Sequence, residues 1–276
     1  MSSMTFMRWA LVLAASTAAA GCPTPTPFET KPSEEDLTAE NLERIQTLEV
    51  PNPFKFVALG DTHDDYTALS SAVAAINARD DVEFVVAAGD LTDLGLVSEF
   101  EWTHDELARL DVPYLTVIGN HDALNNGARI YRDLYGPLDY SFAVGGVKFI
   151  FFNSNTLEFD GEAPSRPWLE QQLADLQGAN SAIWVTHQEI AHPDDGVDGD
   201  GAAFYGRLLD KYPATSLVIH GHRLPHDFTS HHGTPVLQCG TFQVVFTYNV
   251  ITVRDGAAIE IEFCDLDGCA PPVAVP

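Results

Sequence analysis

The chain has 276 residues, of which 45% are hydrophobic and 20% are charged, a composition that can bury the core of one main domain. Its formal net charge of −26 argues against a nucleic-acid partner, since binding a polyanion needs clustered Lys and Arg. An anionic substrate would also be repelled unless positive charge is supplied at its site. Bound metal cations would supply that charge.

The N-terminus has the pattern of an export signal. Arg8 precedes an apolar run from Leu11 to Ala20, which is too short to span a membrane. The following Gly21-Cys22 resembles the lipobox of bacterial lipoproteins, in which the cysteine is acylated and begins the mature protein. Cleavage by ordinary signal peptidase near Ala20 is the alternative. We therefore expect an exported lipoprotein of the bacterial cell envelope, anchored in the membrane by lipid on Cys22, with residues 1–22 as its signal peptide.

Residues 23–50 are rich in Pro, Thr and acidic residues, which predicts a solvated tether, and residues 51–276 form the expected domain. Apolar periodicity then predicts alternating elements along the domain. In chain order these are a helix at 65–79, a strand at 82–88, helices at 98–110 and 127–134, a hairpin at 140–152, a helix at 167–176, a strand at 182–186, a helix at 202–209, and antiparallel strands near 235–253 and 258–263. This order suits an α/β fold, a four-layer α-β-β-α sandwich of two mixed β-sheets flanked by helices.

Three cysteines follow the N-terminal segment. In an exported chain they are candidates for a disulfide. Cys264 and Cys269 bracket a turn after a strand, which favours a local bridge between them and leaves Cys239 as a buried thiol.

Short apolar runs end repeatedly in residues that bind metals. The candidates are Asp61 and His63, Asp90, Asn120 with His121, His187, and His222. Each alone has an ordinary explanation, because an aspartate after glycine often caps a helix or forms a turn. As a set they indicate a metal site, since the carboxyl ends of neighbouring strands meet where α/β sheets bind ligands.

The ordered set resembles the calcineurin-like metallophosphoesterases. The blocks that carry the resemblance are Asp61-Thr-His63, Gly89-Asp90, Gly119-Asn-His-Asp122, His187 and Gly221-His222, and they cover about residues 54 to 226. The stretch from Gly89 to Gly95 also resembles the branch of bacterial cyclic-nucleotide phosphodiesterases. Purple acid phosphatases would have a tyrosine ligand where Asp93 stands.

The resemblance implies two divalent metal ions. Asp90 would bridge them, Asp61 and His63 would bind one ion, and Asn120, His187 and His222 would bind the other. Mixed oxygen and nitrogen ligands suit Mn, Fe or Zn without selecting among them.

The implied reaction is hydrolysis of a small-molecule phosphomonoester or phosphodiester by metal-activated hydroxide. His121 would be the general acid that protonates the leaving alcohol. Asp122 would orient His121 or cap the helix that follows. A non-catalytic binding or scaffold lipoprotein with a degenerate metallophosphoesterase fold is the alternative.

One position departs from the family pattern. The last block is usually Gly-His-x-His, but here Leu224 stands where the second histidine would bind the same ion as Asp61 and His63. Three outcomes are open: His226 substitutes as ligand, the first metal site is weakened or empty, or water takes the place. Arg223 would hold a substrate phosphate or face solvent.

Overall fold

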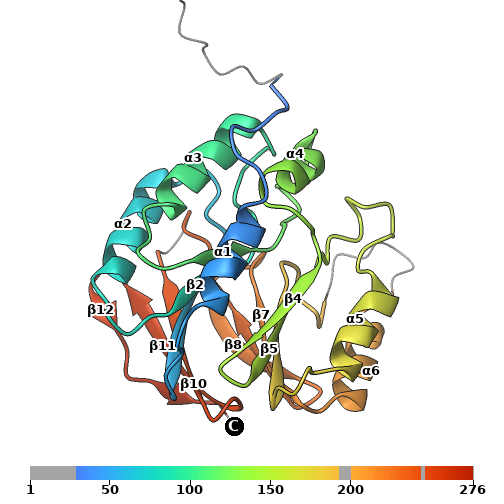
Figure 1. Ribbon diagram of the computed structural model, residues 1–276. Coiled ribbons are helices and arrows are strands. Elements are labelled where there is room, and N and C mark those ends of the chain that lie inside the picture. Colours follow the sequence, from blue (N-terminus) through green and yellow to red (C-terminus); the bar gives the residue numbers. More distant parts are fainter. Residues whose placement is uncertain (1–28, 193–199, 244–245, 276) are drawn as a thin grey trace, which may run out of the picture.

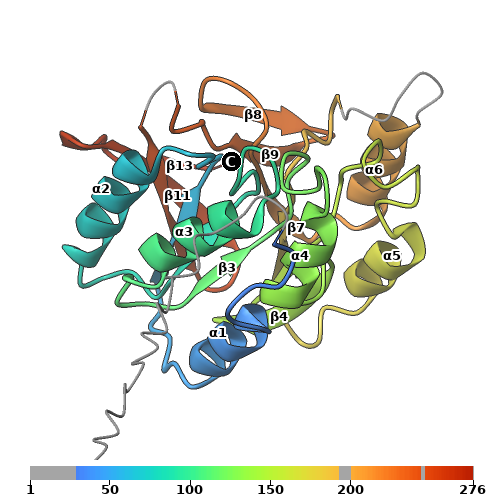
Figure 2. The same ribbon diagram turned by 90° about the horizontal axis from the view of Figure 1, so that it is seen from above.

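A computed structural model describes residues 29–192, 200–243 and 246–275. Two β-sheets pack face to face, and helices cover their outer faces (Figures 1 and 2). The expected four-layer α-β-β-α sandwich is therefore confirmed. The signal peptide, Cys22 and residues 23–28 of the expected tether lie outside the described residues.

The first sheet has the order β12-β11-β10-β1-β2-β3, with β13 also pairing with β11. Its strands are β1 (Phe54–Leu59), β2 (Phe84–Ala87), β3 (Tyr114–Thr116), β10 (Tyr248–Arg254), β11 (Ala258–Asp265), β12 (Gly268–Cys269) and β13 (Val273–Ala274). Strands β1, β2 and β3 are parallel, so their carboxyl ends open at one edge of the sheet. Strands β10 and β11 are antiparallel to their neighbours, as expected.

The second sheet has the order β4-β5-β6-β7-β9-β8. Its strands are β4 (Tyr140–Val144), β5 (Val147–Phe151), β6 (Ser181–Val185), β7 (Thr215–His220), β8 (Asp227–His231) and β9 (Thr234–Gln238). The β4–β5 hairpin turns at Gly145-Gly146, as predicted. The expectation of an antiparallel strand near residue 235 is half wrong: β9 is antiparallel to β8 but parallel to β7. Pairing with a distant strand is not visible in local periodicity.

Three apolar clusters hold the layers together. One lies between the sheets and includes stacked rings of Phe56 and Phe84 with Phe149 edge-on to both. Another packs helices α2 (Tyr66–Asn77), α3 (Val97–Leu107) and α4 (Gly127–Leu134) on the first sheet. The last packs helices α5 (Arg166–Ala174) and α6 (Gly201–Lys211) on the second. The five helices predicted within the domain thus correspond to α2 through α6.

The predicted tether is wrong from residue 37 onward, because a helix, α1 (Leu37–Gln46), packs against the domain. Ile45 joins the cluster between the sheets and Leu37 joins the one under α2 to α4. The Asn41 side-chain oxygen accepts a hydrogen bond from the Tyr114 backbone N–H of edge strand β3 at 3.1 Å. The helix therefore covers β3 and satisfies a donor that a sheet edge would leave unpaired.

Truncation of Ile45 tests whether α1 belongs to the cooperative fold. The side chain is fully buried, so Ile45→Ala should lower the free energy of unfolding by about 2–4 kcal/mol. Urea denaturation of the variant, beside Glu43→Ala on the exposed face of the same helix, measures the difference. Equal stabilities of the two variants would mean that α1 docks too weakly to contribute.

The cysteine prediction is confirmed. Cys264 and Cys269 form a disulfide across the β11–β12 turn, and Cys239 is a buried free thiol.

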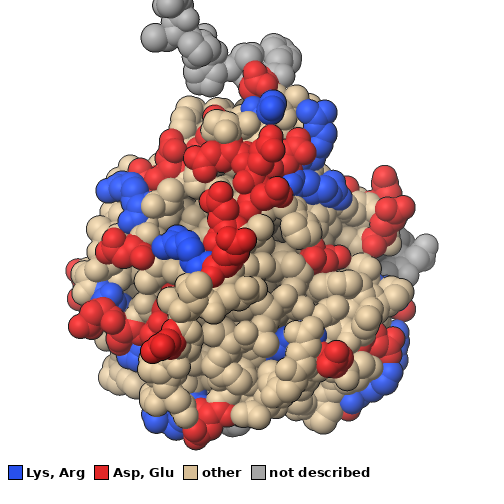
Figure 3. All heavy atoms as spheres, viewed as in Figure 1, with Lys and Arg blue, Asp and Glu red and all other residues tan. Residues whose placement is uncertain are grey.

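Within the described residues, none of the helices combines the length and apolar character that crossing a bilayer requires. The acidic balance is visible on the surface, where acidic side chains gather over the upper part of one face (Figure 3).

Candidate metal centre

The predicted ligands follow the carboxyl ends of five strands from both sheets. Asp61 follows β1, Asp90 follows β2, Asn120 follows β3, His187 follows β6, and His222 follows β7. Since β6 and β7 are parallel, as are β1 to β3, the two sheets present the same ends to one side of the sandwich. The fold thereby brings together side chains that are up to 161 positions apart in the sequence.

A first group consists of Asp61, His63 and Asp90, whose ligand atoms all lie within 4.8 Å of one another. The Asp90 carbonyl accepts hydrogen bonds from the backbone N–H groups of Thr62 and His63, at 3.1 and 2.9 Å. These bonds fix the loop after β1 to the loop after β2. The group matches the ligands expected for the first metal ion.

A second group consists of Asp90, His187 and His222, again within 4.8 Å. The Asn120 side-chain oxygen lies 2.9 Å from both His187 Nε2 and His222 Nδ1. His187 Nδ1 donates a hydrogen bond to the Ala88 carbonyl at 2.8 Å, which turns Nε2 toward the centre. Asp90 is shared by both groups, as a bridging ligand requires.

Two glycines permit this crowding. A Cβ atom on Gly119 would lie 2.1 Å from Asp90 Oδ1, and one on Gly221 would lie 2.2 Å from Asp61 Oδ1. The Asp61 carboxylate also accepts a hydrogen bond from the His222 backbone N–H at 2.9 Å. Glycine in these motifs therefore serves the close approach of backbone to carboxylate.

Backbone strain is concentrated at the same residues. His63, Asp90 and His222 have φ angles of 44°, 48° and 69°. This left-handed backbone conformation is unfavourable for residues other than glycine. Such strain persists where the surrounding structure enforces it, most often at functional sites. Three of the six expected ligands are therefore held in costly positions.

Burial and neighbouring charges shift the pKa values of the two carboxylates and of His187. Burial raises the pKa of Asp61 to about 7, against the opposing charge of His187. Burial alone would raise the pKa of Asp90 as well, but the charge and hydrogen bond of His187 lower it to about 2. In turn, burial disfavours a charged His187, yet the negative charges of Asp90 and Asp61 raise its pKa to about 10.

These observations fit a pair of divalent cations. Buried, close carboxylates are costly unless a cation compensates them. The donor set of carboxylate oxygen, imidazole nitrogen and amide oxygen is suited to Mn, Fe or Zn.

His121 lies beside the first group and is exposed at its surface. Its ring centre is 4.8 Å from that of His63, and 39% of its side chain is accessible. Nδ1 donates a hydrogen bond to the Asp93 carbonyl at 2.9 Å, which leaves Nε2 available. The position suits a group that meets a substrate.

Asp93 is a site residue that the sequence analysis named only as the position of a tyrosine ligand in purple acid phosphatases, without expecting it in the site. Its carboxylate lies 3.3 Å from His63 Nδ1 and 3.8 Å from His121 Nδ1, so the three residues form a further group of candidate ligands. The available signal was its spacing three residues after Asp90.

The contacts of Asp122 correct the role expected for it. Its buried carboxylate accepts hydrogen bonds from the backbone N–H groups of Gly119 and Thr92 and from the Thr92 hydroxyl, at 2.8, 2.9 and 2.9 Å. It neither orients the His121 ring, which is held by Asp93, nor caps α4, whose N-cap residue is Asn126. Asp122 joins the loops after β2 and β3.

Removing this carboxylate should destabilise the protein. Asp122→Ala leaves buried donors unpaired, and we expect a loss of about 2–4 kcal/mol in the free energy of unfolding. Asp122→Asn, whose amide oxygen still accepts, should lose less. Thermal and urea unfolding measure both variants, with Asp133→Ala at an exposed position of α4 as control. An unchanged stability of Asp122→Ala would show that Asp122 does not join the loops.

Leu224 stands where the family has its second histidine. Among the described residues, no residue that closely follows His222 joins the group of Asp61, His63 and Asp90. Leu224 is exposed, and the His226 ring packs 5.5 Å from that of Phe263. Arg223 lies 3.5 Å from Glu189 and donates to the His192 carbonyl at 3.3 Å, so it contacts protein groups beside the site.

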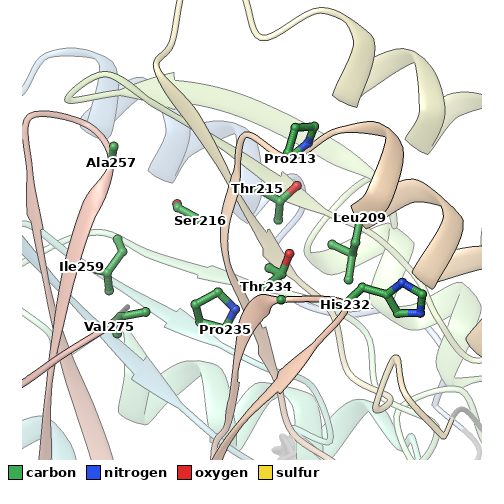
Figure 4. A pocket seen from close by; sticks show the side chains of 11 residues that line it. Leu209, Pro213, Thr215, Ser216, His232, Thr234, Pro235, Ala257, Ile259 and Val275 are labelled. Atoms are coloured by element: carbon green, nitrogen blue, oxygen red, sulfur yellow. The ribbon is translucent and has the colours of Figure 1, made fainter.

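A cavity of about 320 Å³ lies elsewhere, at the start of β7 and β9 (Figure 4). Thr215 and Thr234, the first residues of those strands, line it together with Ile259 and Val275. It is at the opposite ends of the strands from the ligands, so it is separate from the metal centre.

Comparison with known proteins agrees with this geometry. The sequence model of the calcineurin-like phosphoesterases matches residues 54–239. A protein of Vesicomyosocius okutanii named probable cyclic nucleotide phosphodiesterase is 22% identical over 214 residues, which cover 73% of this chain and 88% of that protein.

Two solved structures share the fold. A dimetal phosphatase from Danio rerio has a TM-score of 0.63 at 14% identity, with 82% of this chain and 99% of that chain covered. A purple acid phosphatase from yellow lupin has a TM-score of 0.60 at 15% identity, with 82% of this chain and 55% of that chain covered. The chain thus spans about half the length of the lupin enzyme.

The sequence match covers most of the chain, including all five strand ends that supply candidate ligands. The protein belongs to the calcineurin-like phosphoesterase family and is a metal-dependent phosphoester hydrolase with a dinuclear divalent metal site.

Proposed function

We propose that the protein is a phosphodiesterase in which His121 acts as general acid. The observation that carries the proposal is the juxtaposition of two ligand groups sharing Asp90 with an exposed imidazole beside them. Asp61, His63 and Asp90 would hold one metal ion, and Asp90, Asn120, His187 and His222 the other. When bound, such ions lower the pKa of water to provide hydroxide near neutral pH and neutralise phosphate oxygens.

The protein's own residues then perform the protonation step. His121 Nδ1 is engaged by the Asp93 carbonyl, so the protonated ring presents its Nε2–H to the leaving oxygen. The alcohol leaves as a neutral molecule, and His121 becomes neutral.

The surrounding charge favours a diester over a monoester. Asp93, whose carboxylate is 41% exposed, lies beside His121, and the whole chain carries a net charge of −26. A monoester carries up to two negative charges and a diester one, so this negative charge repels the monoester more. The name of the Vesicomyosocius okutanii relative also supports a diester, although a cyclic nucleotide would be an unexpected substrate for an exported protein.

Metal reconstitution tests the proposal. The protein is stripped with chelator, reloaded singly with Mn, Fe, Zn or Mg, and assayed with bis(p-nitrophenyl) phosphate and p-nitrophenyl phosphate. We expect metal-dependent turnover with a higher kcat/KM for the diester. Turnover no higher than that of His121→Ala would favour the non-catalytic binding protein instead, and a preference for the monoester would refute the charge argument.

We further propose that the chain is exported and lipid-anchored through Cys22. The support is the apolar run followed by Gly21-Cys22 in the sequence. The Thr30 hydroxyl accepts a hydrogen bond from Arg129 of the domain at 2.9 Å. The chain therefore contacts the domain from about residue 30 onward, and the tether would be shorter than residues 23–50. Mass spectrometry of the mature N-terminus tests this; an unmodified N-terminus near Gly21 would mean ordinary cleavage.

A further inference from the structure

Exposed apolar side chains concentrate beside the metal centre. Among the described residues seven large apolar side chains are exposed, and three of them lie within two residues of site motifs. Leu94 follows Asp93 and is 48% exposed, Leu124 follows His121-Asp122 and is 37% exposed, and Leu224 follows Gly221-His222-Arg223 and is 55% exposed. Single exposed leucines are ordinary, but this placement is not random.

Leu94 and Leu124 lie on two loops that are fastened together next to His121. Asn125 Nδ2 donates to the Leu94 carbonyl at 2.8 Å, and the Leu124 N–H donates to the His121 carbonyl at 3.1 Å. A Cβ atom on Gly95 would lie only 2.5 Å from the Leu124 carbonyl oxygen, so the loops are in close contact. His121 therefore lies on the segment that carries Leu124 and is bonded to the segment that carries Leu94.

An aromatic pair lies on α2 and α3, the latter being the helix to which the Leu94 loop is bonded. Glu99 on α3 accepts hydrogen bonds from the N–H groups of Leu94 and Leu96, at 3.0 and 3.1 Å, which fixes the loop to the helix. Trp102, one turn further along α3 and 48% exposed, packs edge-on to Tyr66 with ring centres 5.6 Å apart. We call Leu94, Leu124 and Trp102 the apolar rim.

We infer that the leaving group of the substrate is an uncharged alkyl or aryl alcohol that contacts the apolar rim. The inference rests on the proposed function, in which His121 protonates the leaving oxygen. A water that has lost a proton to solvent adds to phosphorus as hydroxide, the bond from phosphorus to the leaving oxygen breaks, and the His121 proton converts that oxygen to a hydroxyl. The group attached to it must lie against whatever flanks His121.

Charge supports the same assignment. The Asp93 carboxylate lies 3.8 Å from His121 Nδ1, and the chain carries a net charge of −26, so an anionic leaving group would be repelled. An apolar group meets no such penalty and gains by covering exposed leucine and tryptophan.

A substrate with two unactivated ester groups provides an internal test. Methyl n-hexyl phosphate can release either methanol or hexanol, both primary alcohols, and the product ratio reports which group occupies the leaving position. Complete burial of one methylene corresponds to about a fourfold gain, so partial burial of the hexyl chain should favour hexanol by at least ~10-fold. The ratio is measured by NMR with the metal-loaded, full-length protein.

Variants identify the surface responsible. Leu94→Ser with Leu124→Ser should move the product ratio toward 1, and Trp102→Ala should do so in part. Leu266→Ser removes a leucine that is 61% exposed on the β11–β12 turn and should leave the ratio unchanged. Metal content and thermal unfolding are recorded for each variant as a check on folding.

The outcomes separate the two proposals. An equal release of both alcohols would overturn the apolar leaving group while leaving the phosphodiesterase intact. A hexanol preference that survives the double variant would overturn the role of the rim. Failure to hydrolyse either diester with any metal would overturn the proposed function and this inference with it.

Discussion

Replacing Asp90 with asparagine should cause the largest loss of activity of any single substitution in this protein. The carboxylate belongs to both groups of candidate ligands, and its Oδ1 also accepts the His121 backbone N–H at 2.9 Å. Asp90→Asn keeps the shape but removes the negative charge that two cations would share. We expect bound metal to fall from two ions to one or none, and kcat/KM to fall at least ~10³-fold, because several kcal/mol of charge stabilisation are lost.

Metal analysis and kinetics should be read together for this variant. Asp64→Asn is a suitable control, since Asp64 is an exposed aspartate one residue after His63. Full metal content in Asp90→Asn with only a small loss of kcat/KM would contradict a bridging role. The metal content of the unaltered protein would also show what Leu224 costs: occupancy near one ion would point to a weakened first site.

His121→Ala should give the second-largest loss, but without loss of metal. The ring lies beside His63 rather than within either group that shares Asp90. General acid catalysis typically contributes 10²–10⁴-fold, so we expect kcat to fall by about that factor while metal content stays constant. The loss should be greater for dialkyl phosphates than for p-nitrophenyl esters, whose leaving group needs little protonation.

Two further variants make this result specific. His232→Ala, on the β8–β9 turn, controls for loss of an exposed imidazole. Asp93→Asn should be milder than His121→Ala, because the bond to His121 Nδ1 uses the Asp93 backbone carbonyl, which the substitution retains. An equal loss for both ester classes in His121→Ala would exclude proton donation to the leaving group.

Much of the fold was readable from local patterns. The helix at 127–134 and the hairpin turning at Gly145-Gly146 follow from side-chain periodicity and turn residues. α1 was missed because the surrounding Pro, Thr and Glu dominated the composition, although Leu37, Asn41 and Ile45 have the spacing of a helix face. Its stability depends on covering β3 and the space between the sheets, which is a tertiary effect.

Some features of the candidate site could be predicted from the sequence and others could not. The identities of Asp61, His63, Asp90, Asn120, His187 and His222 could be predicted from the sequence, because metal chemistry restricts the residue types and glycine marks the turns that carry them. The role of Asp122 could not be predicted. Although Asp122 is adjacent to His121 in sequence, its carboxylate bonds to Thr92 and Gly119, and the Asp93 backbone carbonyl holds the His121 ring.

By itself, then, the sequence determined which side chains are available as ligands and which strands precede them. Only the tertiary structure decided that Asp93 and not Asp122 holds His121, and that the loops carrying Leu94 and Leu124 are bonded together next to it. The physical reason is that ligand types and strand periodicity are local properties, whereas contacts between loops depend on sheet order and close backbone approach.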